Sequence, residues 1–230
     1  MRRTWSFPML ALLLAVSPAF APASQTPTVQ ASPEAQLQAF IALVGAYPQP
    51  GSDGAKADHA ILLWLQRSRT PGEVSRAENE VTLHLGVFSE VTGKDLTSGP
   101  FPVTRALSED LQKAVRQVTA PLKQHFARPR PYNAFQQIKP AIPLEPSYSY
   151  PSGHATWGMA QAILLAALEP QRREAILERG RQVGYDRVIG GVHYPSDVDA
   201  GQLLGPVIAE AWLALPAQQR RLELARAEWQ

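Results

Sequence analysis

The residues of this sequence that could do chemistry include three cations from two separate stretches of the chain. They are Lys123, Arg130 and Arg187, and none of them belongs to a run of basic residues. An arginine can bind two oxygens of a tetrahedral oxyanion at once, whereas a lysine acts as a point charge. Brought together, the three would hold the oxygens of a phosphoryl group and stabilise the charge that develops when that group is transferred.

Two histidines and their neighbours could supply the other parts of a group transfer. Ser152 and Gly153 precede His154 where a helix is predicted to begin, so a hydroxyl, an unobstructed backbone N–H and the helix dipole would favour an anion there. His193 stands four residues before Asp197. An imidazole is a good nucleophile when neutral and a good acid when charged. Each stretch alone is weak evidence, because a turn, a surface charge or a local hydrogen bond would explain it.

Taken in order, the stretches resemble the three-part signature of the acid phosphatase / vanadium haloperoxidase superfamily, which includes the type 2 phosphatidic acid phosphatases. That signature is Lys, six residues and Arg-Pro; then Pro-Ser-Gly-His; then Ser-Arg, five residues, His, three residues and Asp. The matching blocks here are residues 123–131, 151–154 and 186–197. Three blocks in the right order are far more specific than any one of them.

The resemblance implies a role for each residue of the predicted site. His193 is implied as the nucleophile that forms a phosphohistidine, Asp197 as the carboxylate that orients it, and His154 as the general acid. The implied substrate-binding residues are Lys123, Arg130, Ser152, Gly153 and Arg187. Neither a metal nor another cofactor is expected, because the cations and the helix end supply the positive charge.

The function implied by the resemblance is that of a metal-independent acid phosphatase for small phosphomonoesters, nearest to the secreted bacterial non-specific acid phosphatases. Relatives favour a homodimer. The sequence departs from that subgroup at three positions: Asp186 replaces a Ser, Tyr148 a Gly and Ala155 a Thr. Asp186 could hold Arg187 by a salt bridge or weaken its pull on phosphate.

Three alternative functions remain open at this point. A phosphatase for lipid phosphates or diphosphates, acting at a membrane surface, would use the same motifs. A vanadate-dependent haloperoxidase would use the same pocket, because vanadate mimics phosphate, although such relatives are usually much longer. An oxyanion-binding protein without turnover would need the cations but not a nucleophile facing an acid.

The composition is typical of a globular protein. Hydrophobic residues make up 45% and charged residues 18% of the 230 residues, cysteine is absent, and the net charge is +2. Because no Lys/Arg-rich run occurs, nucleic acid is not expected as a main partner. Two early arginines, an apolar run and Ala21-Pro22-Ala23 predict a signal peptide over residues 1–23, and hence a periplasmic or secreted protein.

The remainder of the chain is predicted to be an all-α, compact helical bundle with its active site at helix ends. A flexible segment (24–35) should precede a single helical phosphatase domain (36–230), and no later apolar run reaches the roughly 20 residues of a membrane span. The proline-rich residues 128–151 predict a long loop without helix. Helices are predicted at 36–44, 57–67, 70–91, 108–126, 153–168, 171–184, 195–215 and 217–230.

Overall fold

The computed structural model describes residues 32–230, and every regular element in that range is a helix, which confirms the all-α prediction. The predicted signal peptide and residues 24–31 lie outside the described range. None of the described helices combines the length and apolar character that a membrane crossing needs. In chain order the elements are α1 (Pro33–Val44), α2 (Asp53–Ser68), α3 (Pro71–Asn79), η1 (Leu85–Phe88), α4 (Ser89–Thr92), α5 (Pro102–Phe126), α6 (Pro131–Ala134), α7 (Gly153–Leu168), η2 (Pro170–Arg172), α8 (Arg173–Ile189), α9 (Pro195–Leu213) and α10 (Pro216–Arg226).

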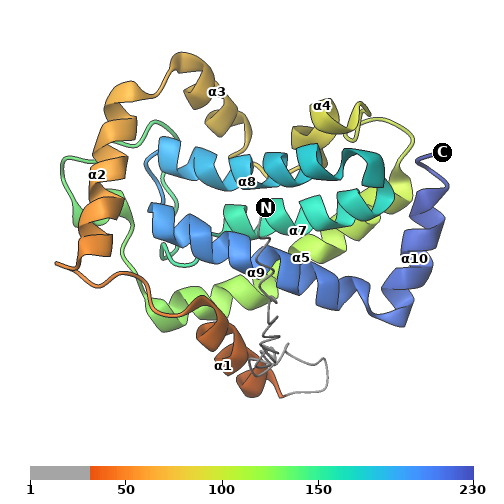
Figure 1. The fold of residues 1–230 in the computed structure, drawn as a ribbon, viewed down its shortest axis with the longest axis horizontal. Coiled ribbons are helices and arrows are strands. Elements are labelled where there is room, and N and C mark those ends of the chain that lie inside the picture. The colour runs from red at the N-terminus through yellow and green to blue at the C-terminus, as the bar shows by residue number, and fades with distance from the viewer. Residues whose placement is uncertain (1–31) are drawn as a thin grey trace, which may run out of the picture.

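Helix α7 lies at the centre of the bundle, between α8 and α9 and against α5 (Figure 1). Its Ala- and Leu-rich sequence is buried on nearly all sides, as expected for a helix without a polar face. Because α8 runs antiparallel to both neighbours, its C-terminal end lies beside the N-terminal ends of α7 and α9 (Figure 1). Two of the three predicted motifs sit at these ends, and the motif that contains Lys123 lies at the C-terminal end of α5.

Glycines bring the three helices together at backbone distance. A Cβ added to Gly180 of α8 would lie 2.7 Å from the carbonyl oxygen of Gly158 on α7. On α9, a Cβ at Gly201 would lie 2.5 Å from the Ser152 carbonyl oxygen, and one at Gly205 would lie 2.5 Å from that of Thr156. No side chain fits between such surfaces. The three ends that carry the motifs are therefore held by direct contact between main chains.

The prediction of one continuous helix over 70–91 was wrong, because residues 80–84 are not helical. The predicted start is confirmed, since Thr70 and Glu73 form a capping box at α3, but α3 ends at Asn79. Glu80 is buried and pairs with Arg179 of α8, which also donates to the Val87 carbonyl. These contacts with α8 outweigh the local helical pattern, as tertiary packing commonly does.

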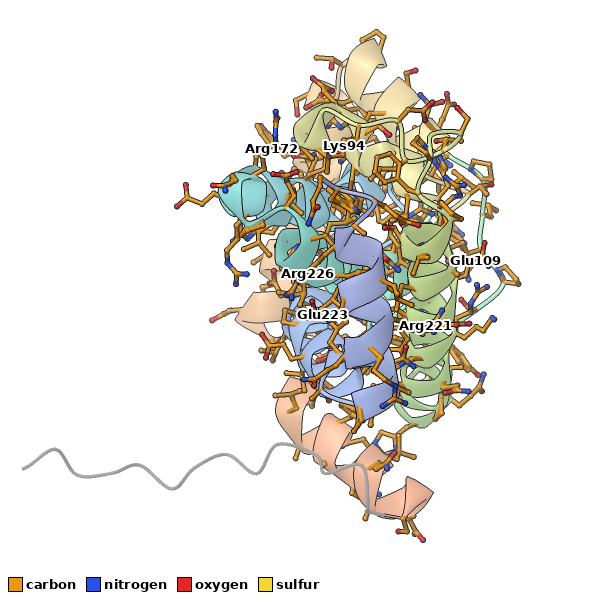
Figure 2. All side chains as sticks on the ribbon, turned by 90° about the vertical axis from the view of Figure 1, so that its right-hand side faces the viewer. Lys94, Glu109, Arg172, Arg221, Glu223 and Arg226 are labelled. Carbon is orange, nitrogen blue, oxygen red and sulfur yellow. The ribbon has the colours of Figure 1, made fainter. Side chains whose placement is uncertain are left out.

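Other helix boundaries differ from the predicted ones because of contacts with residues far away in the sequence. Helix α5 begins at Pro102, six residues before the predicted start, because the carboxylate of Glu228 accepts hydrogen bonds from Val103 N (2.6 Å) and Thr104 N (2.9 Å). Helix α10 confirms the helical tail and lies beside α5 (Figure 2). Arg221 of α10 donates a hydrogen bond to Asp110 of α5 at 2.9 Å.

Three further boundaries differ from the predicted ones. The proline-rich segment, predicted to be free of helix, contains the single turn α6. Helix α1 begins at Pro33, so the last residues of the predicted flexible segment are helical. Helix α8 continues to Ile189, five residues beyond the predicted end, and so takes in Arg187.

Candidate active site

The eight predicted site residues come together at the end of the bundle where α7 and α9 begin and α8 ends. Helix α7 opens with Gly153 and His154, α8 carries Arg187 in its last turn, and α9 carries Asp197 in its first turn. His193 lies in the short α8–α9 connection, in which Gly191 adopts a left-handed φ of 76°. The backbone N–H groups of Val192 and His193 both donate to the Arg187 carbonyl, which fixes the start of this connection.

The hydrogen bonds of His193 determine which ring nitrogen carries the proton. The side chain is fully buried, and Nε2 lies 2.9 Å from Nη1 of Arg130. Because a guanidinium can only donate, Nε2 must hold a lone pair, and the proton must be on Nδ1, 3.1 Å from Asp197 Oδ2. Burial, together with the charges of Arg130 and Lys123, lowers the pKa of His193 well below its usual value. The ring is thus held neutral, with Nε2 available as a nucleophile.

Asp197 is fixed by contacts on both oxygens. Oδ2 accepts from the Tyr194 N–H (2.9 Å) and the Ser149 hydroxyl, besides facing His193. Oδ1 accepts from Arg128 Nη1 at 2.6 Å, and Arg128 in turn donates to Asp58 at 2.9 Å. These partners hold the carboxylate in the orientation that keeps the Nδ1–H tautomer of His193.

Arg130 and Arg187 converge on one position, which a carboxylate of the proline-rich segment occupies. Glu145 Oε2 accepts from Arg130 Nη2 at 2.6 Å, and Oε1 accepts from Arg187 Nη2 at 2.5 Å. Burial alone would raise the pKa of Glu145, but the surrounding positive charges, including those of Arg130 and Arg187, hold it well below its ordinary value. The two guanidinium groups therefore form an anion-binding position.

Arg187 has hydrogen-bonding capacity that its present partner does not use. The residue is fully buried, and its Nε and Nη1 atoms have no hydrogen-bond partner within residues 32–230. Buried donors without partners are costly and rare in folded proteins. A ligand with more oxygens than a carboxylate would satisfy them.

His154 faces the anion position through Nδ1, which lies 3.8 Å from Glu145 Oε1. Its other nitrogen, Nε2, lies 3.3 Å from the carbonyl oxygen of Val81, in the segment that interrupts the predicted 70–91 helix. Burial and the nearby Arg187 lower the pKa of His154 to about 4. A bound dianion next to Nδ1 would act in the opposite direction, because negative charge favours the protonated ring.

Lys123 is buried beside the first turn of α7 and donates to the carbonyls of Tyr148 (2.6 Å) and Ser149 (3.2 Å). Burial, followed by the charge of Arg130, lowers its pKa from 10.5 to about 7. Ser152 caps α7, its hydroxyl accepting from the Ala155 N–H at 3.3 Å. A Cβ on Gly153 would lie 4.0 Å from Lys123 Cε, so the lysine stem lies beside the helix start.

Two of the three departures from the motif have structural explanations. Asp186 does not pair with Arg187, so the hypothesis that it holds this arginine was wrong. It points the other way and receives two hydrogen bonds of 2.8 Å from Arg76. Ala155 lies where Cβ atoms on Gly184 and Gly201 would be only 2.8 Å from its own Cβ, so the small side chain suits the helix crossing.

Sequence reasoning missed Glu145, Arg128 and Ser149. Arg128 and Ser149 support Asp197, and Glu145 bridges the two arginines. Each of the three lies within or next to the proline-rich segment, whose sequence carries no periodicity from which contacts could be predicted.

Comparison with known proteins adds three findings. The profile of the PAP2 superfamily matches residues 99–221, more than half of the chain. The chain is 30% identical over 199 residues to a non-specific acid phosphatase of Providencia stuartii, covering 82% of this chain and 80% of that protein. It is 33% identical over 147 residues to a non-specific acid phosphatase of Salmonella typhimurium, covering 62% of this chain and 59% of that protein.

The fold is similar to that of a solved structure, the first transmembrane PAP2 type phosphatidylglycerolphosphate phosphatase from Bacillus subtilis. The TM-score is 0.50 at 20% sequence identity, and the alignment covers 77% of this chain and 92% of the other.

Proposed function

The chain belongs to the PAP2 superfamily, and on that premise we propose that it is a metal-independent acid phosphatase that hydrolyses small phosphomonoesters through a phosphohistidine on His193. One observation carries the proposal: His193 is buried with an Nε2 lone pair beside Arg130 and with Nδ1 facing Asp197. The signal-peptide pattern of residues 1–23 supports a periplasmic or secreted location.

In the first step, His193 Nε2 attacks the phosphorus atom of the substrate. The bond between phosphorus and the leaving oxygen breaks, and His154 Nδ1 gives a proton to that oxygen. The imidazole of His193 becomes positively charged, and Asp197 stabilises this charge through the Nδ1–H. Arg130, Arg187 and Lys123 bind the non-bridging oxygens of the phosphoryl group, which takes over the position that the Glu145 carboxylate holds in the structure.

In the second step, a water molecule attacks the phosphorus atom of the phosphohistidine. His154, now neutral, takes a proton from this water while the phosphorus–nitrogen bond breaks. Inorganic phosphate leaves, and both histidines return to their starting protonation states. With a pKa of about 4 in the free site, His154 is mostly unprotonated near neutral pH and could not donate a proton. The negative charge of the bound phosphoryl group raises this pKa, so His154 becomes a proton donor once substrate is bound.

We expect the purified protein, assayed from about pH 4 to about pH 8, to hydrolyse p-nitrophenyl phosphate in excess EDTA and to be inhibited by vanadate. Three cations supply the charge stabilisation for which other phosphatases use metal ions. The measurement is release of p-nitrophenol before and after extensive chelation. Loss of turnover on chelation, restored by a divalent metal, would contradict the metal-independent mechanism. A folded protein without turnover at any pH would leave lipid phosphatase or oxyanion binding as the remaining alternatives.

The upper alkaline limb of the pH profile should report Lys123, because the general acid His154, with a pKa of about 4 in the free site, sets a separate fall at lower pH. The pKa of Lys123 is lowered to about 7, so its charge is present below that pH and is lost as the pH rises through it. Because kcat/KM follows ionisations of the free enzyme, kcat/KM should fall above this pH. Lys123→Arg should move the limb upward by about one pH unit or more, since guanidinium stays charged. Ionisation of the substrate is the same for both proteins and cancels in the comparison.

The matched control for this variant is Lys113→Arg, an exposed lysine on the same helix. Its pH profile should coincide with that of the wild type. An unchanged alkaline limb in an active Lys123→Arg enzyme would show that another group controls it.

A further inference from the structure

Glu145 holds the position between the two arginines at which a substrate phosphoryl group would bind. Its oxygens lie 2.6 Å from Arg130 Nη2 and 2.5 Å from Arg187 Nη2, and His154 Nδ1 lies 3.8 Å away. A carboxylate bridging two guanidinium groups uses the same planar donors that recognise phosphate. Substrate and Glu145 therefore cannot occupy this position together.

The side chain of Glu145 can leave this position without a change in its backbone. The Tyr132 hydroxyl donates to the Glu145 carbonyl at 2.8 Å and accepts from the Glu145 N–H at 3.1 Å, which anchors the peptide groups on both sides. The side chain itself is 25% exposed, so it has a path to solvent. Rotation about its staggered side-chain bonds would turn the carboxylate outward.

A phosphoryl group gains more from this position than the carboxylate does. Glu145 leaves two buried donors of Arg187, Nε and Nη1, without a partner in the described part of the chain. Both carboxylate oxygens are already engaged, whereas a phosphoryl group brings a third oxygen. Satisfying a buried donor removes the cost of leaving it unpaired.

Charge decides how strongly a ligand binds once Glu145 has left the position. A carboxylate attached to the chain competes at a high effective concentration, so a free anion of equal charge is at a disadvantage. A phosphomonoester dianion brings twice the charge of a phosphodiester monoanion to Arg130, Arg187 and Lys123, and its attraction to them is correspondingly larger.

Resting on the proposed function, we propose that Glu145 is an internal competitor of the substrate, which occupies Arg130 and Arg187 in the empty site and lowers the apparent affinity for every phosphate ligand by the same factor. Only a ligand that binds the three cations strongly, as a phosphomonoester dianion does, then occupies the site at low concentration. The residue is not needed for the chemical step itself. Removing its charge should therefore improve the binding of monoesters and diesters alike.

The test compares Glu145→Gln with the wild type and with Glu109→Gln, which removes the same charge from an exposed position on α5 (Figure 2). Calorimetry near neutral pH gives the dissociation constant of inorganic phosphate. Steady-state kinetics give kcat/KM for p-nitrophenyl phosphate and for bis-p-nitrophenyl phosphate. In Glu145→Gln, phosphate should bind about tenfold more tightly, because the fraction of open sites rises, and kcat/KM should rise by about the same factor for both esters. Glu109→Gln should match the wild type in both.

Glu145→Asp provides a second variant that keeps the charge but is one methylene too short to bridge both arginines. It should shift both quantities in the same direction as Glu145→Gln, by less. Weaker phosphate binding in these variants would mean that Glu145 positions the arginines, and would overturn the proposal, as would an unchanged kcat/KM for both esters. If wild type and variants neither bind phosphate nor hydrolyse either ester, the phosphatase function itself fails, a result distinct from the two preceding ones.

Discussion

Replacing His193 with alanine should lower kcat for p-nitrophenyl phosphate by at least about 1,000-fold, because the variant lacks the atom to which the phosphoryl group is transferred. The side chain is fully buried, and its Nε2 atom faces the anion position beside Arg130. No other imidazole in the described site has one nitrogen facing an arginine and the other facing a carboxylate. Steady-state assay of the variant measures the loss directly.

A second readout separates loss of the nucleophile from simple damage to the site. Wild-type protein quenched during turnover of a radiolabelled phosphomonoester should carry label that survives alkali and is released by acid, as a phosphohistidine does. His193→Ala should carry none. The matched control is His125→Ala, an exposed histidine inside the first motif but at none of its fixed positions, whose ring packs against Phe126. His193→Ala with turnover within about tenfold of the wild type would rule out this nucleophile.

Asp197→Asn should lower kcat by about 1,000-fold while leaving the nucleophile in place. An asparagine that keeps its carbonyl oxygen on the Tyr194 N–H and the Ser149 hydroxyl would offer no negative charge to the His193 imidazolium. The substitution would also remove the negative charge that pairs with Arg128, whose Nη1 lies 2.6 Å from Asp197 Oδ1. We therefore expect the free energy of unfolding to fall by about 2 kcal/mol as well.

The control for this second variant is Asp199→Asn, which removes a carboxylate from the exposed side of the same helical turn. It should leave kcat within about twofold of the wild type, as most surface changes do. Denaturant titration of both variants measures stability separately from activity. If Asp197→Asn keeps full activity, Asp197 has no part in stabilising the charged histidine.

Where the signals are local, the sequence allowed the fold class to be predicted, and it allowed the residues that the structure brings together at one end of the bundle to be singled out. The apolar stretch of α7 follows a capping serine, and its predicted bounds agree with the structure. The α9 start at Pro195 is likewise a local signal. The site motifs could be identified because their spacing is fixed along the chain, and the helix packing then brings them to one end of the bundle.

What could not be predicted depends on contacts between distant residues. Glu145 reaches Arg187 across 42 positions, and Arg76 reaches Asp186 across 110. Neither contact follows from the helical periodicity on which the sequence predictions were based. The interruption between α3 and α4 has the same origin, because Glu80 pairs with Arg179 of α8 although the residues around it favour a continuous helix.

The backbone contacts at Gly180, Gly201 and Gly205 have a consequence for the accuracy with which the reacting groups are aligned. Where helices meet through long side chains, each rotamer change moves one helix relative to the next. Here α7, α8 and α9, whose ends carry or flank the reacting groups, meet main chain to main chain at these glycines, so a rotamer change cannot move one helix relative to the next there. Catalytic groups need to be aligned to within about half an ångström. In this protein, how precisely these groups stay aligned depends on the stiffness of the polypeptide backbone.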